Sequence, residues 1–423
     1  ARGQKALFLK AAVILALTYV GVAVTRLPRV NVDRPSAAFT GAVLMVLLGV
    51  LSFDAAMKEI DFHIIGLLLG MMLLVAVLKQ AGFFTYLASR LLSIGTSPVR
   101  LMVMVVVATG ALSALLVNDA VVLMFTPVVV QACRSMRANP APYLIAEAMA
   151  SNIGSTATMV GNPQNMLIGT KSGISFGYFF LALAPVAMAS LAALVLVIWL
   201  FYRREFRNGF DADLTLLRGQ AQVRPYVLRR ALFILVPTII AFFLSSTLGV
   251  SISVIALTAG AAVLLVARVR PADVMRDVDW VLLLFFVGLF VVIGGARQAG
   301  VLDVILDNVT ITPDLKGMVV LHMVSTVVSQ LVSNVPLTML VVPIIEQVPG
   351  KLLWISLASG ATLGGNMTII GAVANLIVAE VAFRDGVSVP FRQFLSVGVV
   401  VTALTLALSI GILAVEWKLG FLG

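Results

Sequence analysis

The chain has few of the residue types on which most catalytic and metal sites depend. Its 423 residues include one cysteine and two histidines, and only 11% are Asp, Glu, Lys or Arg. A single thiol excludes an internal disulfide and any site built from several thiolates. The histidines, His63 and His322, have no partner at ligand spacing, so we expect no metal site and no cofactor. The scarcity of charge also excludes a sizeable soluble domain.

Apolar residues are what the sequence has in abundance, at 61% of the chain. Runs long enough to cross a bilayer recur along it, which predicts an all-α polytopic membrane protein. In a membrane protein the basic residues behind the formal net charge of +10 chiefly indicate how the spans are oriented, and they do not indicate nucleic-acid binding. Clustered acids or histidines near one face, as a membrane-embedded enzyme would need, are lacking, and we expect no enzyme.

The sequence contains one apolar unit twice. The segment 61–82 returns as 279–300, with its first Asp and its closing Gln-Ala-Gly aligned. Farther on, the pattern Gly-x3-Thr-x2-Gly-x3-Asn begins at Gly154 and again at Gly364. Duplicated units that Gly, Pro and Asn interrupt at matching places are typical of secondary transporters whose substrate site lies between the repeats.

Two interrupted segments in each copy predict irregular elements. The segments 99–131 and 318–346 have polar centres and limbs too short for two crossings, which favours re-entrant hairpins. The segments 142–172 and 352–384 read as helices broken at the midplane. Each repeat is therefore expected to hold five transmembrane helices, one of them broken, and one re-entrant hairpin. Because five is odd, the second repeat is inverted.

These elements divide the chain into a first repeat, 1–202, a basic linker, 203–230, and a second repeat, 231–423. The positive-inside rule predicts both termini outside and the linker in the cytoplasm, because most of the 29 Lys and Arg residues then lie inside. Full crossings in place of the hairpins would put both termini inside and give a poorer balance. Lys79 and Arg297 lie at helix ends and are expected to snorkel. A soluble ATPase subunit could dock on the linker.

The breaks and hairpin tips supply the candidate site. A broken helix in lipid frees backbone groups, which is tolerable only where they face protein or a wet cavity. Pro163 stands where a second half-helix would begin, and that N-terminus carries partial positive charge. The expected substrate-binding residues are neutral and lie at the tips and breaks: Asn118, Ser333, Asn334, Thr158, Gly161, Asn165, Thr368, Gly371 and Asn375.

The two copies differ in polarity at several aligned positions. Asp119 corresponds to Val335 and Glu147 to Leu357, so the carboxyl groups belong to the first copy alone. An ionisable group inside the membrane is a functional candidate by default, and Asp119 at a hairpin tip is the expected proton-coupling residue. Glu147 is expected near a membrane face in a structural role.

The stretch SNIGSTATMVGNPQNMLIG (Ser151–Gly169), followed by SGISFGYFF, resembles the ArsB/NhaD group of the ion transporter superfamily. This group holds arsenite efflux permeases, the silicic-acid exporters of plants, NhaD-type sodium/proton antiporters and the melanosomal P protein. The related sodium-coupled dicarboxylate transporters carry Ser-Asn-Thr at both tips. Here the tips read Val117-Asn118-Asp119 and Ser333-Asn334-Val335. That departure argues against a sodium-coupled anion carrier, and Asp119 favours protons.

Within the resembled group we expect export of arsenite and antimonite across the cell (inner) membrane. Both are uncharged trihydroxides at neutral pH, so a pocket of Asn, Thr and backbone dipoles with no dedicated cation fits them. Few thiols are present to trap trivalent arsenic, and inward proton movement would drive export. The alternatives are a sodium/proton antiporter with Asp119 as a sodium ligand, another metalloid or anion transporter of the superfamily, and a channel.

Overall fold

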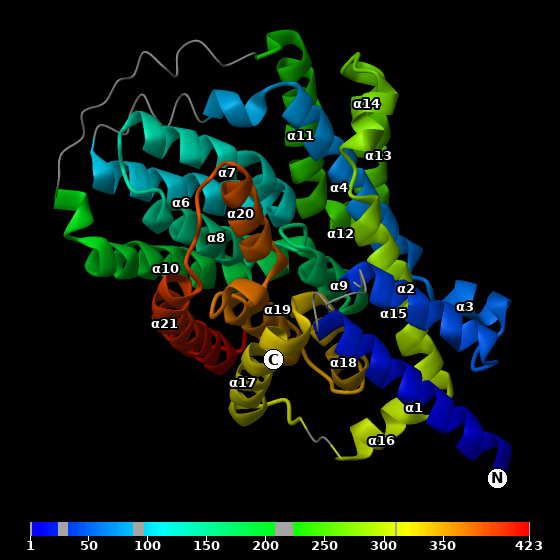
Figure 1. Cartoon of the computed structure of the whole chain (residues 1–423). Coiled ribbons are helices and arrows are strands. Elements are labelled where there is room, and N and C mark those ends of the chain that lie inside the picture. Colours follow the sequence, from blue (N-terminus) through cyan, green and yellow to red (C-terminus); the bar gives the residue numbers. More distant parts are fainter. Residues whose placement is uncertain (1, 24–32, 88–96, 208–222, 309–310, 423) are drawn as a thin grey trace.

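The structure is a computed structural model that describes residues 2–23, 33–87, 97–207, 223–308 and 311–422. Every regular element within these residues is a helix (Figure 1). Eight of the helices are long and apolar enough to cross a membrane by length and composition. The prediction of an all-α polytopic membrane protein is confirmed.

The first repeat runs from α1 to α10. Its helices are α1 (Arg2–Ala23), α2 (Arg34–Leu47), α3 (Phe53–Glu59), α4 (Phe62–Gln80), α6 (Pro98–Leu115), α7 (Asn118–Ser135), α8 (Ala141–Ser155), α9 (Pro163–Lys171) and α10 (Phe176–Tyr202). A short 3-10 turn, η1 (Glu205–Arg207), follows, and residues 208–222 of the basic linker lie outside the described residues.

The second repeat repeats this order. Its helices are α11 (Pro225–Phe243), α12 (Ser245–Leu248), α13 (Ile252–Val266), α14 (Pro271–Arg276), α15 (Trp280–Gln298), α16 (Val301–Asn308), α17 (Leu315–Val332), α18 (Asn334–Ile345), α19 (Leu352–Gly364), the 3-10 turn η3 (Ile369–Gly371), α20 (Val373–Arg384) and α21 (Phe391–Lys418). The aligned sequences pair α4 with α15, the hairpin α6–α7 with α17–α18, and the broken helix α8–α9 with α19–α20.

The repeats interlock through two aligned glycines. A Cβ atom on Gly70 of α4 would lie 2.3 Å from the backbone of Ala256 in α13. A Cβ atom on Gly288 of α15 would lie 2.7 Å from the backbone of Ala38 in α2. Each long helix therefore packs directly on the other repeat, as small residues allow inside a membrane. Helices α1–α4 and α11–α16 form one bundle, which we call the scaffold.

Ion pairs also join the repeats within the scaffold. The Lys79 Nζ lies 2.6 Å from an Asp277 carboxylate oxygen, and the Arg297 guanidinium lies 2.6 Å from Glu59. Lys79 and Arg297, which the sequence predicts to snorkel from helix ends, thus also contact carboxylates of the other repeat.

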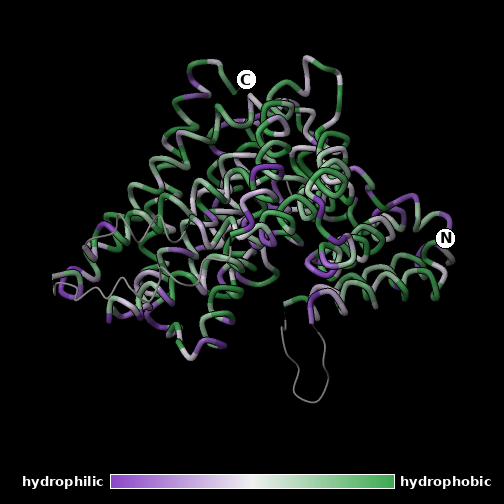
Figure 2. Tube along the Cα trace, turned by 90° about the horizontal axis from the view of Figure 1, so that it is seen from above, coloured by the Kyte–Doolittle hydropathy of each residue, from purple (hydrophilic) through white to green (hydrophobic). Residues whose placement is uncertain are grey.

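Helices α6–α10 and α17–α21 form a second bundle, which we call the core. It lies to one side of the scaffold in Figure 1. Glycine again permits close packing, since a Cβ atom on Gly154 of α8 would lie 2.1 Å from the Gly110 carbonyl oxygen of α6. Figure 2 shows apolar residues along most of the trace and hydrophilic residues both at its ends and near its centre.

The breaks fall where the sequence predicts them. Helix α8 ends at Ser155 and α9 begins at Pro163, which confirms Pro163 as the first residue of the second half-helix. The hairpin limbs differ from the expectation of short segments, since α6, α7 and α17 have 18 residues each and only α18, with 12, is short. Only one or two residues separate the limbs at each tip, so the chain reverses directly at the centre of the core.

Candidate functional site

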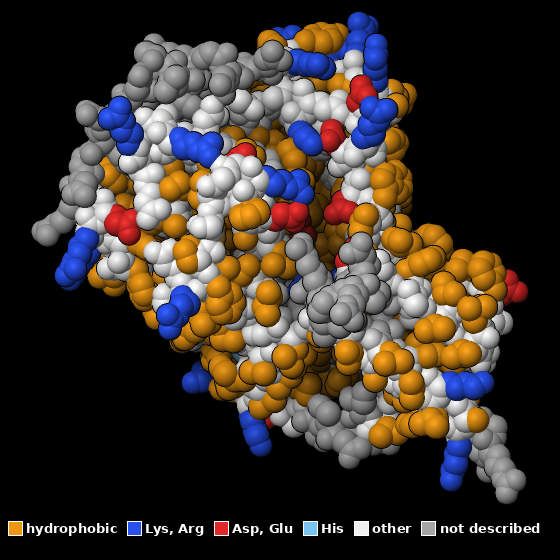
Figure 3. Space-filling view, viewed as in Figure 1, with side chains coloured by type: hydrophobic (Ala, Val, Ile, Leu, Met, Phe, Trp, Pro, Cys, Tyr) orange, Lys and Arg blue, Asp and Glu red, His pale blue; other side chains and the backbone are white. Residues whose placement is uncertain are grey.

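A cavity of about 930 Å³ lies between the core and the scaffold and takes its walls from both repeats. On the face shown in Figure 3, acidic and basic side chains surround its mouth. Four core helices, α7, α9, α18 and α20, begin at this cavity. Their first-turn N–H groups lack intrahelical partners and carry partial positive charge. At the tips and breaks the polar residues that line the cavity are Asn118, Asp119, Asn152, Gln164, Ser333 and Asn334, and Glu380, Arg384 and Ser388 line it farther along the core.

The first hairpin tip is fixed to the first break. The backbone N–H of Asn118 donates to the Gly161 carbonyl oxygen at 2.8 Å. The Asn118 Nδ2 donates to Asn152 Oδ1 at 3.3 Å, and its own Oδ1 is buried without a hydrogen-bond partner among the described residues. The tip therefore meets the break, as predicted. The Asn118 Oδ1 is left as a hydrogen-bond acceptor that a bound solute could use.

The second tip meets the second break in a different conformation. The Asn334 side chain, with its amide oriented by its neighbours, donates to the carbonyl oxygens of Gly371 and Ala361 at 3.0 Å each. Ser333 between the two limbs has φ 71° and ψ 167°, a region that is nearly restricted to glycine and costs about 1–3 kcal/mol. This strained residue lines the cavity, so the strain lies where the two repeats meet.

Asn152 of α8 links the repeats beneath the cavity. Its Nδ2 donates to Asn366 Oδ1 at 2.8 Å and to Asn375 Oδ1 at 2.9 Å, and its Oδ1 accepts from Asn118. Thr362, the aligned residue of α19, accepts in turn from Gln164 at 3.2 Å. Sequence reasoning missed both residues. The available signal was that polar side chains occupy this aligned position in both helices.

Other predicted site residues lie behind the cavity surface and hold the breaks together. Asn165 Nδ2 donates to the carbonyl oxygens of Ser155 and Thr158 at 3.1 Å each. Asn375 does the same for Gly365 at 2.9 Å and Thr368 at 3.0 Å. Carbonyl groups freed by each break are thus satisfied inside the protein.

The remaining predicted residues also make contacts within the core. The Thr158 hydroxyl donates to the Ala114 carbonyl oxygen at 2.5 Å, and the Thr368 hydroxyl donates to Gln330 Oε1 at 2.8 Å. A Cβ atom on Gly161 would lie 2.4 Å from the Ser155 carbonyl oxygen, and one on Gly371 would lie 2.5 Å from the Gln330 side chain. Only Asn118, Ser333 and Asn334 of the predicted substrate-binding set line the cavity.

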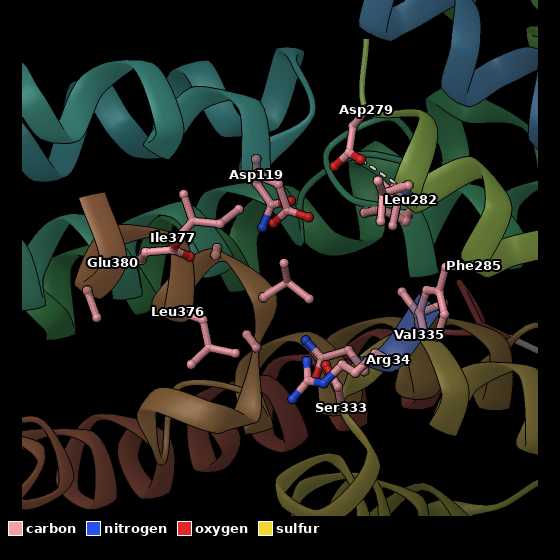
Figure 4. Close-up of a pocket in the computed structure, with 18 of the residues that line it drawn as sticks. Arg34, Asp119, Asp279, Leu282, Phe285, Ser333, Val335, Leu376, Ile377 and Glu380 are labelled. Carbon is pink, nitrogen blue, oxygen red and sulfur yellow. Dashed lines mark hydrogen bonds between the residues drawn. The ribbon is translucent and has the colours of Figure 1, made fainter. Parts of the chain in front are cut away.

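Charged groups face the cavity from both bundles. Asp119 stands in the first turn of α7 and points into it, opposite Asp279 at the start of α15 (Figure 4). Arg34 at the start of α2 donates to the Ile370 carbonyl oxygen at 3.3 Å, and no carboxylate of the described residues lies within 4.0 Å of it. The expectation of a pocket without a cation is therefore wrong. In the sequence, Arg34 is only one of the 29 basic residues that are counted for orientation.

Glu147 lies inside the core, not near a surface. It is fully buried on α8 and accepts a hydrogen bond at 3.0 Å from the Thr126 hydroxyl of α7. This contact between α7 and α8 fits the structural role expected of Glu147. His322 is also buried and contacts the hydroxyls of Ser359 and Ser409, a hydrogen-bonded structural position. Among the described residues no group of three His, Cys, Asp or Glu side chains could hold a metal ion.

Two repeats of spanning helices, with hairpin tips and helix breaks around a central cavity, are typical of membrane transporters. The comparison with family models agrees, since residues 13–351 match the citrate transporter family. The chain belongs to this family.

Relatives among known proteins are transporters or membrane proteins. The chain is 31% identical to the 46 kDa membrane protein of Mycobacterium leprae, over 94% of this chain and 97% of the relative. It is 29% identical to the silicon efflux transporter LSI3 of Oryza sativa subsp. japonica, over 84% and 87%. The solved YdaH transporter of Alcanivorax borkumensis has the same fold, with a TM-score of 0.58 at 15% identity over 99% of this chain and 98% of that structure.

Proposed function

We propose that this transporter exports arsenite and antimonite, as neutral trihydroxides, in exchange for protons. The observation that carries the proposal is the pairing of uncharged tips with one unmatched carboxyl group. Asn118, Ser333 and Asn334 bring amides and a hydroxyl from both repeats to one cavity. Asp119 faces the same cavity, and its aligned partner is Val335.

The lining suits a small hydroxylated solute. N–H groups at the starts of α7, α18 and α20, which no side chain caps, donate to hydroxyl oxygens, and the unpartnered Asn118 Oδ1 accepts from a hydroxyl proton. Silicon, named in the rice relative, also forms a small uncharged hydroxide near neutral pH, which supports this class of substrate for the present chain. The one thiol, Cys133, is buried on α7 away from the tip, so no soft ligand would retain trivalent arsenic.

Uphill export of a neutral solute requires a coupled ion. Asp119 is the group we assign to that task, because it is the carboxylate at a hairpin tip and the described residues place no Lys or Arg within ion-pair distance of it. Binding of a proton and of substrate in one cavity would let each bias the movement of the core.

We place both termini outside and the basic linker in the cytoplasm of a cell with this transporter in its inner membrane. In this orientation Arg34 and Arg384, which both line the cavity, lie on the cytoplasmic side. The cavity is then open to the compartment from which an exporter takes its substrate. Residues 208–222, where an ATPase subunit would dock, lie outside the described part of the chain.

An anion carrier is the second candidate, and Arg34 is the observation that favours it. A guanidinium without a carboxylate partner, next to four helix N-termini, would suit a carboxylate or oxyanion, and the family takes its description from citrate. Replacing Arg34 by Gln separates the two. A hydrogen bond to a charged group is worth about 1.5–3 kcal/mol, so an anion would lose roughly 10- to 100-fold in transport, whereas arsenite transport should change less than about fivefold.

Everted vesicles test the proposal directly. Arsenite uptake is measured with an imposed pH gradient, without it, and with a sodium gradient instead. The proposal predicts that arsenite accumulates above its outside concentration only when the vesicle interior is acidic. An uncoupler that removes this pH gradient should abolish the accumulation. Accumulation driven by sodium alone would identify sodium coupling. Sodium flux without arsenite uptake, or strictly downhill arsenite flux, would overturn the proposal in favour of an antiporter or a channel.

A further inference from the structure

An ion pair closes the molecule on the side away from the cavity. Lys171 in the last turn of α9 contacts Asp61, the N-cap of α4, with 2.7 Å between Nζ and Oδ2. The side chains are 37% and 12% exposed, so the pair is partly shielded from solvent. Since α9 belongs to the core and α4 to the scaffold, this contact joins the two bundles.

The residues at the corresponding helix ends of the second repeat are apart. Asp279 is the N-cap of α15, as Asp61 is of α4, and Arg384 stands in the last turn of α20, as Lys171 does in α9. Asp279 and Arg384 both line the open cavity. Arg384 instead contacts Glu380 of its own helix at 2.7 Å.

The second repeat has a charged residue at each of the two corresponding helix ends, although α20, with 12 residues, is three residues longer than α9 and places Arg384 three residues beyond the position that aligns with Lys171. The scaffold supplies a reference. Its aligned pairs Lys79–Asp277 and Arg297–Glu59 are both formed, at 2.6 Å each. Gln80 and Gln298 add matching hydrogen bonds at 3.0 Å. Among these ion pairs, the two within the scaffold are formed alike in both repeats, and only the two that would join core to scaffold differ.

The cavities follow the same division. The cavity between α20 and α15 measures about 930 Å³. The space between α9 and the far end of α15, which Lys171 lines, measures about 80 Å³. The closed ion pair thus coincides with the closed side, and the separated pair coincides with the open side.

We propose that Asp61–Lys171 and Asp279–Arg384 are two alternating gates, of which one forms only when the other is broken. Movement of the core that closes the present cavity carries the end of α20 toward the start of α15 and withdraws the end of α9 from the start of α4. Each ion pair, when formed, stabilises the state of the transport cycle in which its side of the protein is closed. This inference depends on the transporter class of the protein and not on the proposed substrate.

Glu380 makes the two gates unequal. It lies four residues before Arg384, and the residue four before Lys171 is Leu167. Arg384 therefore has a competing partner on its own helix while its gate is open, whereas α9 contains no acidic residue that could compete for Lys171. Such a partner biases the protein toward the state with the large cavity open.

Thiol cross-linking tests the gates. In a Cys133→Ala background, one variant carries Asp61→Cys with Lys171→Cys, a second carries Asp279→Cys with Arg384→Cys, and a third carries all four changes. A short bifunctional thiol reagent is added to membranes. We expect each two-thiol variant to cross-link and to lose transport when it does. In the four-thiol variant no molecule should carry both links.

Two controls keep the result interpretable. Lys79→Cys with Asp277→Cys should cross-link without dependence on the other links, because that pair stays within the scaffold. If Cys133→Ala fails to fold, the wild-type background serves, since Cys133 is buried. Adding Glu380→Gln to the first variant, in which Arg384 is intact, should lower its cross-linking rate by up to about fivefold, the effect of one partly exposed ion pair. Both links in one molecule, or no link between the second pair while transport continues, would overturn the proposal.

Discussion

Helix α9 begins with a cap, and its counterpart α20 begins without one. Asn162 Oδ1 accepts the backbone N–H of Asn165 at 2.8 Å, whereas the aligned Ala372 has no side chain that can do so. The same contrast recurs at the tips, where Asp119 stands opposite Val335 in the alignment. Both repeats build the same break, yet only the second leaves its helix start free toward the cavity.

This comparison distinguishes residues that stabilise the broken helices from residues that face the substrate cavity. The elements that both repeats share are close glycine contacts and asparagines that bind freed carbonyl groups, such as Asn165 and Asn375. These elements make a broken helix stable in a membrane. The elements that differ, Asp119 and the free start of α20, face the cavity. A substitution at a shared position should therefore impair transport in either repeat. A substitution at an unshared position should matter only in the repeat that carries the functional residue.

The largest effects are expected at the shared glycines. Gly161→Leu and Gly371→Leu should each abolish transport, because even a Cβ atom would lie within 2.4 or 2.5 Å of a neighbouring oxygen. Arsenite resistance of expressing cells, normalised to protein in the membrane, is the measurement. Gly411→Leu on α21 is the matched control, since no heavy atom lies within 4 Å of a Cβ there. Wild-type resistance from either glycine variant would mean that its break is not needed.

The two tip asparagines come next. Asn118→Ala and Asn334→Ala should each lower transport about 10- to 100-fold, because each leaves a buried hydrogen-bonding partner unsatisfied. Transport rates in vesicles and size-exclusion profiles in detergent distinguish lost function from lost folding.

Exposed Asn139, which contacts Glu205 at the surface, provides the control for both tip variants. Asn139→Ala should transport at the wild-type rate. Should only one tip variant lose transport, the equal use of both repeats would be refuted.

The smallest effects concern the helix cap. Ala372→Ser should give α20 the kind of cap that α9 has, and stabilise the protein by about 0.5–1 kcal/mol, while it lowers transport by occupying an N–H group at the cavity. Asn162→Ala should destabilise by about 1 kcal/mol. Thermal unfolding in detergent measures both. A Ser variant that is stabilised and transports faster than wild type would show that the free helix start has no role.

The sequence predicts the fold and the central elements well, because duplication and local chemistry are visible in it. Aligned Gly and Asn residues predict the breaks, and Pro163 predicts the start of α9, which the structure confirms. Both tips could be located for the same reason. Asp119 could be singled out because one repeat has a carboxyl group where the other has valine.

Residues that reach the cavity by packing across the repeats could not be predicted. Arg34 belongs to the second helix and contacts the second break, 336 residues later in the chain. Asn152 joins Asn118 to Asn366 and Asn375, a set that no spacing reveals. The roles of Asn165 and Asn375 also depend on where the freed carbonyl groups point, which is a tertiary property.

Asp119→Asn, assayed in everted vesicles, tests the central claim most directly, because an amide keeps the shape of the carboxyl group but cannot carry its proton. Two rates are compared with wild type: arsenite accumulation driven by a pH gradient, and downhill exchange of arsenite at equal pH. We predict that the variant loses accumulation and retains exchange. Accumulation equal to wild type, with the same dependence on pH, would contradict the claim and move the coupling to another group, with Glu147 next in line.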